Sequence, residues 1–186
     1  MIQNLKQIVQ DLYNTPSDIN EHIPTLISYG DKVNHITEFG VRGICSTWAF
    51  LASKPNTLIS YDLEDPSKWG GNIKDVYDTA AHYEINFKFI KDNVLNVDIE
   101  NTDLLFIDTW HVYDQVIQEL NLHSHKVNKY LIFHDTTTFA VNGESPGYKG
   151  LKYGIDEFLS NNINWKFHEE FPYNNGLTIL KRVNHE

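Results

Sequence analysis

The sequence predicts an α/β fold, in which a mostly parallel sheet carries helices on both faces and ends in an antiparallel hairpin. Short apolar runs alternate with segments of helical periodicity along most of the 186 residues. Two of these runs, "TDLLFIDT" and "KYLIFHDT", are almost continuously apolar, as buried parallel strands are. Near the C-terminus, two strand-like segments flank "PYNNG", a turn-rich stretch that is typical of a hairpin.

Each element is predicted from its own segment. The chain begins with an amphipathic helix, because apolar residues recur at helical spacing from Leu5 to Leu12, and a polar stretch with two prolines follows. The helix "STWAFLAS" has Ser46 or a neighbour near its cap. Further helices are indicated by the spacing within 73–80, 112–120 and 151–159. The expected strands are, in order, "HITEFG", "TLISYDLE", "INFKFIKDN", "TDLLFIDT", "KYLIFHDT", "WKFHEEF" and "GLTILKR".

Composition limits the classes of partner. The formal net charge is -10 and no run of Lys and Arg occurs, so nucleic acid and anionic membranes are poor partners. The one cysteine, Cys45, cannot form an internal disulfide, which fits a reducing cytoplasm. The N-terminus lacks the apolar block of a signal peptide, and no run approaches the ~20 apolar residues of a membrane helix. We expect one cytoplasmic domain over 1–186, with a helical cover in 1–33 and the core in 34–183.

Acidic or polar residues follow almost every predicted strand. In sheets of this kind, ligands bind outside the carboxyl ends of the strands. A set rich in carboxylates is unlike a phosphate cradle, and it suits a ligand with hydroxyls, amines and a positive charge. The residues are Glu38, Gly40, Asp62, Asp92, Asp108, His111, His134 and Asp135.

Asp62 indicates a ribose. It ends the second strand about 20 residues beyond the first turn, where an acid can bind two ribose hydroxyls. NAD would satisfy that acid, but NAD also needs a glycine-rich turn for its pyrophosphate, and the turn here is "GVRGIC". S-adenosylmethionine has a ribose, an adenine, an amino-acid end and a sulfonium but no phosphate. It therefore fits these residues better.

Five segments carry a family resemblance. In order and at the expected intervals, "ITEFGVRGICS", "ISYDLE", "LLFIDTWHVYDQVIQEL", "YLIFHDTTTF" and "NNGLTILKR" resemble class I S-adenosylmethionine-dependent methyltransferases. More narrowly, they are similar to the small-molecule O-methyltransferases of the catechol, macrocin and cephalosporin-hydroxylase-like groups. The resemblance covers about residues 34–183. It implies a Rossmann-like fold with a mostly parallel seven-stranded sheet.

The resemblance also implies roles for the residues that match the first motif. Glu38 and Gly40 match its start, and the Gly40 backbone would approach the methionine end of the cofactor. Ser46 matches the serine that opens the following helix. Relatives usually have glycine where this chain has Ile44, and we expect Gly43, one position earlier, to supply the permissive backbone.

The later motifs complete the implied cofactor site. Asp62 matches the ribose acid, Asp92 matches the acid near the adenine, and Asp108 with His111 matches the "IDGxHxY" segment. Arg42 either contacts the cofactor carboxylate or pairs with a neighbouring acid.

The strand ends also carry candidate ligands for a divalent ion. In many relatives, acids after the fourth and fifth strands hold such an ion, and Asp108 and Asp135 match two of those positions. His134 occupies the third. Mg²⁺ prefers oxygen ligands, so histidine suits a softer ion such as Mn²⁺, or no ion. The alternative is a hydrogen-bonded pair of His134 and Asp135 at a strand end.

The sequence predicts an O-methyltransferase that acts on a small-molecule hydroxyl, with a sugar hydroxyl favoured by analogy. Asp108, His111 and His134 are the candidates for proton removal, with Asp108 and His111 preferred, and the adjacent helix N-terminus is expected to lower the pKa of His111. The segment "FAVNGESPGYKG" is expected to be a lid over the acceptor or plain surface. A non-catalytic S-adenosylmethionine-binding protein and a nucleotide-dependent oxidoreductase or sugar-modifying enzyme are the alternatives. The oligomeric state, a homodimer included, is left open.

Overall fold

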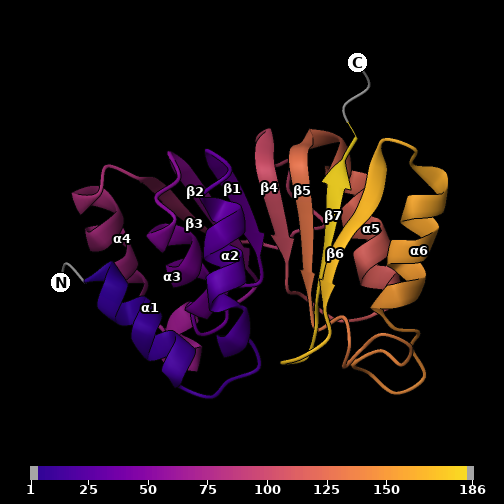
Figure 1. The fold of residues 1–186 in the computed structure, drawn as a ribbon, viewed down its shortest axis with the longest axis horizontal. Helices are drawn as coiled ribbons and strands as arrows, with labels where there is room; N and C mark the ends of the chain where they lie inside the picture. The colour runs from indigo at the N-terminus through magenta and orange to yellow at the C-terminus, as the bar shows by residue number, and fades with distance from the viewer. Residues whose placement is uncertain (1–3, 184–186) are drawn as a thin grey trace. The chain divides into compact units, whose positions relative to one another are not determined.

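The computed structural model describes residues 4–183 and divides into two compact units, Met1–Val94 and Leu95–Glu186 (Figure 1). We call them unit 1 and unit 2. The single domain expected over 1–186 stays a prediction. Among residues 4–183, no helix has the length and apolar character needed to cross a membrane. The cytoplasmic location also stays a prediction.

Unit 1 contains three strands and the helices drawn in indigo and magenta in Figure 1. All three strands are parallel, in the order β3-β2-β1, with Ile36 opposite Leu58 and Leu58 opposite Phe87. The elements are α1 (Leu5–Asn14), η1 (Asn20–His22), α2 (Ile23–Gly30), β1 (His35–Phe39), α3 (Cys45–Ala52), β2 (Thr57–Asp62), η2 (Pro66–Trp69), α4 (Ile73–His82) and β3 (Asn86–Lys91).

Packing within unit 1 fixes the turn that follows β1. The helices α1 and α2 both pack against α3, while α4 packs against β3. Phe39, Phe50 and Leu58 are fully buried, so β1, α3 and β2 share one apolar core. This core anchors both ends of the segment that connects β1 to α3.

Unit 2 contains the other four strands, in the order β4-β5-β7-β6. The β4–β5 pair is parallel, and β7 runs antiparallel to both β5 and β6. The elements are β4 (Thr102–Ile107), α5 (Tyr113–His123), η3 (Ser124–Lys126), β5 (Val127–His134), α6 (Leu151–Asn161), β6 (Trp165–Phe171) and β7 (Leu177–Arg182). The predicted mostly parallel, seven-stranded sheet with an antiparallel C-terminal hairpin is confirmed.

Close helix packing places the turn after β4. The helices α5 and α6 lie side by side in Figure 1 and pack against each other. They approach so closely at Gly154 that a Cβ there would lie 2.5 Å from Cγ1 of Val116. The β4 and β5 strands are buried almost throughout, as their apolar runs predict.

The helix α3 begins at Cys45, adjacent to Ser46 as expected, and Ile44 occupies its N-cap position without a side-chain cap. One local expectation is wrong. The stretch with two prolines is not simply polar, because it contains η1 and the eight-residue helix α2. Proline near the first turn of a helix is favourable, since the nitrogen there needs no partner within the helix.

Candidate functional site

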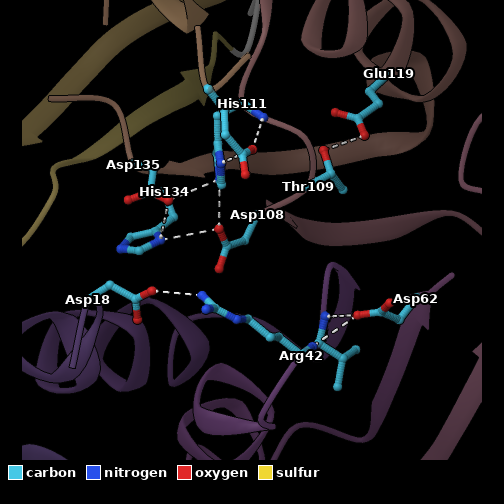
Figure 2. Close-up of polar contacts among 11 residues, drawn as sticks. Asp18, Arg42, Asp62, Asp108, Thr109, His111, Glu119, His134 and Asp135 are labelled. Carbon is cyan, nitrogen blue, oxygen red and sulfur yellow. Dashed lines mark hydrogen bonds and ion pairs between the residues drawn. The ribbon is translucent and has the colours of Figure 1, made fainter. Parts of the chain in front are cut away.

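In unit 1, the turn after β1 is held by the acid that ends β2. Gly40 has a φ of 84°, in the left-handed region, and its N–H donates to the Tyr61 carbonyl oxygen at 2.9 Å. The N–H groups of Val41 and Arg42 both donate to Oδ2 of Asp62, at 2.7 and 2.9 Å (Figure 2). Asp62 therefore fixes the backbone of this turn.

The same contacts limit what else Asp62 can bind. Its Oδ1 accepts a further hydrogen bond from the Glu64 N–H at 2.8 Å. A carboxylate offers about four lone-pair sites, and three of them are used within the chain. Asp62 thus retains room for one ribose hydroxyl, whereas the expected bidentate contact would displace a turn N–H. The ribose contact stays a prediction in this reduced form.

Gly40, Arg42 and Ile44 have positive φ in this turn, and the expectation that Gly43 supplies the permissive backbone is wrong. Ile44 has a φ of 63°, while Gly43 is outside the left-handed region. A branched side chain with positive φ costs about 1–2 kcal/mol of backbone strain. Ile44 is 5% exposed, so its burial offsets this strain. Both residues line a cavity of about 360 Å³ that also borders α1 and Trp48.

Glu38 and Ser46 lie inside unit 1. Glu38 is fully buried, and its carboxylate accepts hydrogen bonds from the hydroxyls of Ser46 at 2.6 Å, Thr47 at 2.9 Å and Ser60 at 2.5 Å. Three hydroxyls from α3 and β2 thus meet one acid of β1. This network connects β1, α3 and β2 next to the turn. Direct contact of Glu38 or Ser46 with a cofactor stays a prediction.

Arg42 and Asp92 lie at the surface of unit 1. The Arg42 guanidinium pairs with Asp18 at 2.9 Å, which is the second of the two roles expected for it (Figure 2). Asp92 follows β3, is exposed, and accepts a hydrogen bond from the Asn93 N–H at 2.7 Å. Contact with the adenine stays a prediction for Asp92, as contact with the cofactor carboxylate does for Arg42.

In unit 2, the ends of β4 and β5 bring four of the predicted residues together (Figure 2). Nε2 of His111 lies 3.0 Å from Oδ1 of Asp108 and 3.1 Å from Oδ2 of Asp135. Nδ1 of His134 lies 3.2 Å from the same Asp108 oxygen. The His134 imidazole is 3.8 Å from Asp135, so its main partner is Asp108. The His111 ring also stacks on Phe139.

The donors that fit a divalent ion are Asp108, His111 and Asp135, with His111 where the sequence suggested His134. One ligand atom from each lies within 4.8 Å of the others. Oδ1 of Asp135 is buried and meets no hydrogen-bond donor among the described residues, so it retains an unused acceptor. One nitrogen and two carboxylates fit Mn²⁺ or Zn²⁺ better than Mg²⁺, because Mg²⁺ prefers oxygen alone.

The imidazoles and carboxylates set one another's protonation. Burial would raise the pKa of Asp108, but His134 and His111 outweigh it and hold that pKa well below its usual range. Burial would lower the pKa of His111, but the neighbouring carboxylates outweigh it and raise that pKa. The expectation of a lowered His111 pKa is therefore wrong, because Asp108, Asp135 and Glu144 all favour the protonated ring. Burial raises the pKa of Asp135.

Glu144 is a part of this cluster that the sequence did not indicate. Its Oε2 lies 3.1 Å from Nδ1 of His111 and accepts from the His111 N–H at 3.3 Å. In return, the Glu144 N–H donates to the His111 carbonyl oxygen at 3.1 Å. The two residues are 33 positions apart in the chain, with α5 and β5 between them, so no periodicity connects them.

Glu119 is a second residue that the sequence analysis missed. It is fully buried on α5, and its Oε1 accepts from the Thr109 hydroxyl at 2.7 Å and the Gln115 amide at 2.8 Å. Its Oε2 is buried without a partner among the described residues. Burial raises the pKa of Glu119 to about 7. Glu119 therefore holds the residue next to Asp108 with a carboxyl group that is neutral below that pH.

The fold is that of proteins that bind S-adenosylmethionine. The chain is similar to a Podospora anserina methyltransferase bound to S-adenosylhomocysteine, at 14% identity over 97% of this chain and 88% of that one, with a TM-score of 0.62. A Bacillus cereus O-methyltransferase in complex with S-adenosylhomocysteine matches at 11% identity over 96% and 90%, with a TM-score of 0.62. The magnesium protoporphyrin IX methyltransferase of Synechocystis with bound S-adenosylmethionine matches at 11% over 97% and 98%, with a TM-score of 0.63.

These likenesses confirm the predicted fold class. No protein-family model and no curated protein matches the sequence. At identities of 11–14%, the solved structures establish that the chain has the class I methyltransferase fold. Its activity must be argued from its own residues.

Proposed function

We propose that this protein is an S-adenosylmethionine-dependent O-methyltransferase that acts on a small molecule. The observation that carries the proposal is the Gly40 turn, whose backbone N–H groups are held by the acid at the end of β2. A fold shared with structures that contain S-adenosylmethionine or S-adenosylhomocysteine supports it. The missing phosphate-binding turn argues against NAD and the oxidoreductase alternative.

Unit 1 carries the cofactor in this proposal. The Gly40 backbone accommodates the methionine end, one free acceptor site of Asp62 takes a ribose hydroxyl, and Asp92 takes the adenine. Glu38 and Ser46 hold the turn in shape. The Asp62 carboxylate is suited to this task because its three N–H donors already fix its orientation.

Unit 2 carries the groups that act on the acceptor. Methyl transfer is an in-line displacement: the acceptor oxygen bonds to the methyl carbon, the carbon–sulfur bond breaks, and the hydroxyl proton leaves. His111 accepts that proton once its own Nε2 proton is lost, and Asp108 and Asp135 stabilise the imidazolium that forms. In the alternative role, Asp108, His111 and Asp135 would hold a divalent ion that lowers the pKa of a bound hydroxyl, and the Nε2 of His111 would then be a ligand and not the base.

The acceptor we propose first is a sugar hydroxyl. The related folds include enzymes for dissimilar small molecules, among them 1,6-didemethyltoxoflavin and magnesium protoporphyrin IX, so the fold alone leaves the acceptor open. A protein that binds the cofactor without catalysis is the alternative.

Turnover tests the proposal directly. The protein is incubated with S-adenosylmethionine and a panel of sugars, catechols and other hydroxyl compounds, and S-adenosylhomocysteine release is measured with and without EDTA. We expect release with at least one acceptor, and a loss in EDTA that Mn²⁺ reverses would identify His111 as a metal ligand and not the base. Cofactor binding without release on any acceptor would favour the non-catalytic alternative, and full activity in excess EDTA would remove the metal.

A further inference from the structure

The segment 141–149 in unit 2 encloses a cavity that the reaction has not yet used. The segment follows β5 and precedes α6, and the cavity has a volume of about 470 Å³, within the usual range of small-molecule pockets. It is lined by Val141, Asn142, Gly143, Ser145, Pro146, Gly147, Tyr148, Lys149 and Tyr153.

Backbone hydrogen bonds hold this segment in place. Asn142 and Lys149 form an antiparallel bridge, and the Gly143 N–H donates to the Tyr148 carbonyl oxygen at 2.9 Å. The Tyr113 N–H at the start of α5 donates to the Lys149 carbonyl oxygen at 2.8 Å. The segment is thus built onto the helices of unit 2, and the cavity is preformed.

Aromatic rings surround the cavity and remain open to solvent. Tyr148 and Tyr153 line the cavity and are 44% and 43% exposed, and Trp110, which contacts Tyr148, is 41% exposed. The Trp110 and Tyr148 rings meet edge to face with centroids 5.0 Å apart, and the Trp110 indole N–H donates to the Ser145 hydroxyl at 3.1 Å. Their orientation is therefore fixed in the absence of a ligand.

Hydrogen-bonding groups lie among these rings. Asn142 and Ser145 offer an amide and a hydroxyl, and the Lys149 ammonium sits 5.5 Å from the centre of the Tyr153 ring. A sugar has the groups that complement such a site. Its C–H faces carry partial positive charge and pack on the negative faces of aromatic rings, while its hydroxyls bond to donors and acceptors at the edge.

The segment is connected to the proton-transfer cluster through Glu144. Glu144 bonds to both the backbone and the ring of His111, while its neighbour Ser145 lines the cavity and bonds to Trp110. Trp110 is adjacent to His111 in the chain. A molecule in the cavity would contact Ser145, and Ser145 is the neighbour in the chain of Glu144, which contacts His111.

We propose that the cavity of segment 141–149, with Trp110 at its side, is the site that recognises a saccharide acceptor, and that Glu144, next to Ser145 of the cavity, holds the His111 ring in place for proton removal. This inference rests on the proposed function for its meaning, because it names the substrate class of that activity. The binding site itself stands on the geometry of unit 2 alone.

Sugar binding is measured directly, so that the result does not depend on turnover. The probes are the methyl glycosides of a hexose, an aminohexose and a hexuronic acid, with catechol as the competing class of planar acceptor. Saturation-transfer NMR on the full chain detects each contact, and titration gives the dissociation constant. We expect at least one glycoside to bind, and catechol to bind more weakly or not at all.

Two variants locate the site. Tyr148→Ala and Trp110→Ala should each weaken glycoside binding by at least about tenfold, since each removes one stacking face. Tyr13→Ala is the matched control, because Tyr13 is equally exposed at 45% and lies on α1, and it should leave binding unchanged. Binding of no glycoside, preference for catechol, or glycoside binding that survives both variants would overturn the proposal.

Glu144 is tested as a positioning residue once a bound glycoside is methylated. Glu144→Ala should lower kcat while leaving the glycoside dissociation constant unchanged, and Glu144→Gln should restore part of kcat because its amide oxygen can still accept from Nδ1 of His111. An unchanged kcat in Glu144→Ala would overturn this part. S-adenosylhomocysteine binding is measured on the same samples, so failure of the cofactor assignment is distinguished from failure of the sugar site.

Discussion

Two acids, the buried Glu38 in unit 1 and the half-buried Asp108 in unit 2, have different kinds of hydrogen-bond partner. Glu38 accepts hydrogen bonds from three hydroxyls, which keep their protons across the whole physiological pH range. Asp108 lies against two imidazoles, which gain and lose protons near neutral pH. The first arrangement is suited to holding a backbone in shape, and the second to exchanging a proton or a cation.

Removing the Glu38 carboxylate should have the largest effect on stability. Glu38→Ala leaves three buried hydroxyls without their acceptor and opens a cavity, which should lower the free energy of unfolding by about 3 kcal/mol or more. Glu38→Gln keeps the shape and one acceptor oxygen, and it should cost less. Urea denaturation measures both, and equal stability of Glu38→Ala and the wild type would show that the network does not stabilise unit 1.

Glu119 extends the comparison, because burial outweighs its hydrogen-bond partners and raises its pKa. Its pKa is about 7 in the folded protein against 4.5 as the ordinary value, so between these pH values the unfolded chain releases a proton that the folded chain keeps. Stability should therefore fall as pH rises through this window, by up to about 3 kcal/mol in total. Glu119→Gln cannot ionise and should remove this fall.

The measurement for Glu119 is the difference in the free energy of unfolding between Glu119→Gln and the wild type, taken at pH 5 and pH 8. Taking the difference between Glu119→Gln and the wild type cancels the titration of the neighbouring histidines and acids. The variant should gain on the wild type at pH 8. A difference that is the same at both pH values would contradict the assignment of a raised pKa to Glu119.

His111 tests whether the cluster around Asp108 exchanges a proton. Because neighbouring acids raise its pKa, the neutral ring that can accept a proton forms only above the ordinary value of 6.5. The acidic limb of the rate profile should lie above that pH, and His111→Gln should lose at least about 10²-fold in rate together with the limb. Near-normal turnover in His111→Gln would move proton removal to Asp135.

The smallest expected effect concerns the turn after β1. Gly43→Ala should change stability by less than about 1 kcal/mol or raise it slightly, because Gly43 lies outside the left-handed region and an added Cβ would meet only the Trp69 carbonyl oxygen at 3.8 Å. Gly40→Ala is the matched control and should destabilise by about 1–2 kcal/mol, because its φ of 84° strains any side chain. Equal effects of the two substitutions would mean that Gly43 shares the permissive role after all.

The strands and the residues at their ends follow from the sequence for a physical reason. Continuous apolar runs such as "YLIF" are typical of buried strands between two layers, and an acid soon after such a run marks the strand end. Asp62, Asp108 and Asp135 are found this way. The helix α2 was missed because Pro24 lies within its first turn and the segment is short.

The internal partners of these residues do not follow from the sequence. The contact of Glu144 with His111 joins two segments that α5, η3 and β5 separate in the chain, and no periodicity encodes it. The strain at Ile44 is set by how α3 packs and not by local preference, which favours glycine there. Glu119 did leave a signal, since it lies three residues after Val116 on the apolar face of α5.

Calorimetric titration with S-adenosylhomocysteine tests the central claim, that unit 1 binds this cofactor through the turn held by Asp62. We expect the wild type to bind S-adenosylhomocysteine and not NAD, and Asp62→Asn to bind it at least about tenfold more weakly, because charge-assisted hydrogen bonds to the turn and the ribose are lost. Glu64→Gln, which keeps the N–H that Asp62 accepts, should bind as the wild type does. Binding of NAD without binding of S-adenosylhomocysteine, or full affinity in Asp62→Asn, would contradict the account.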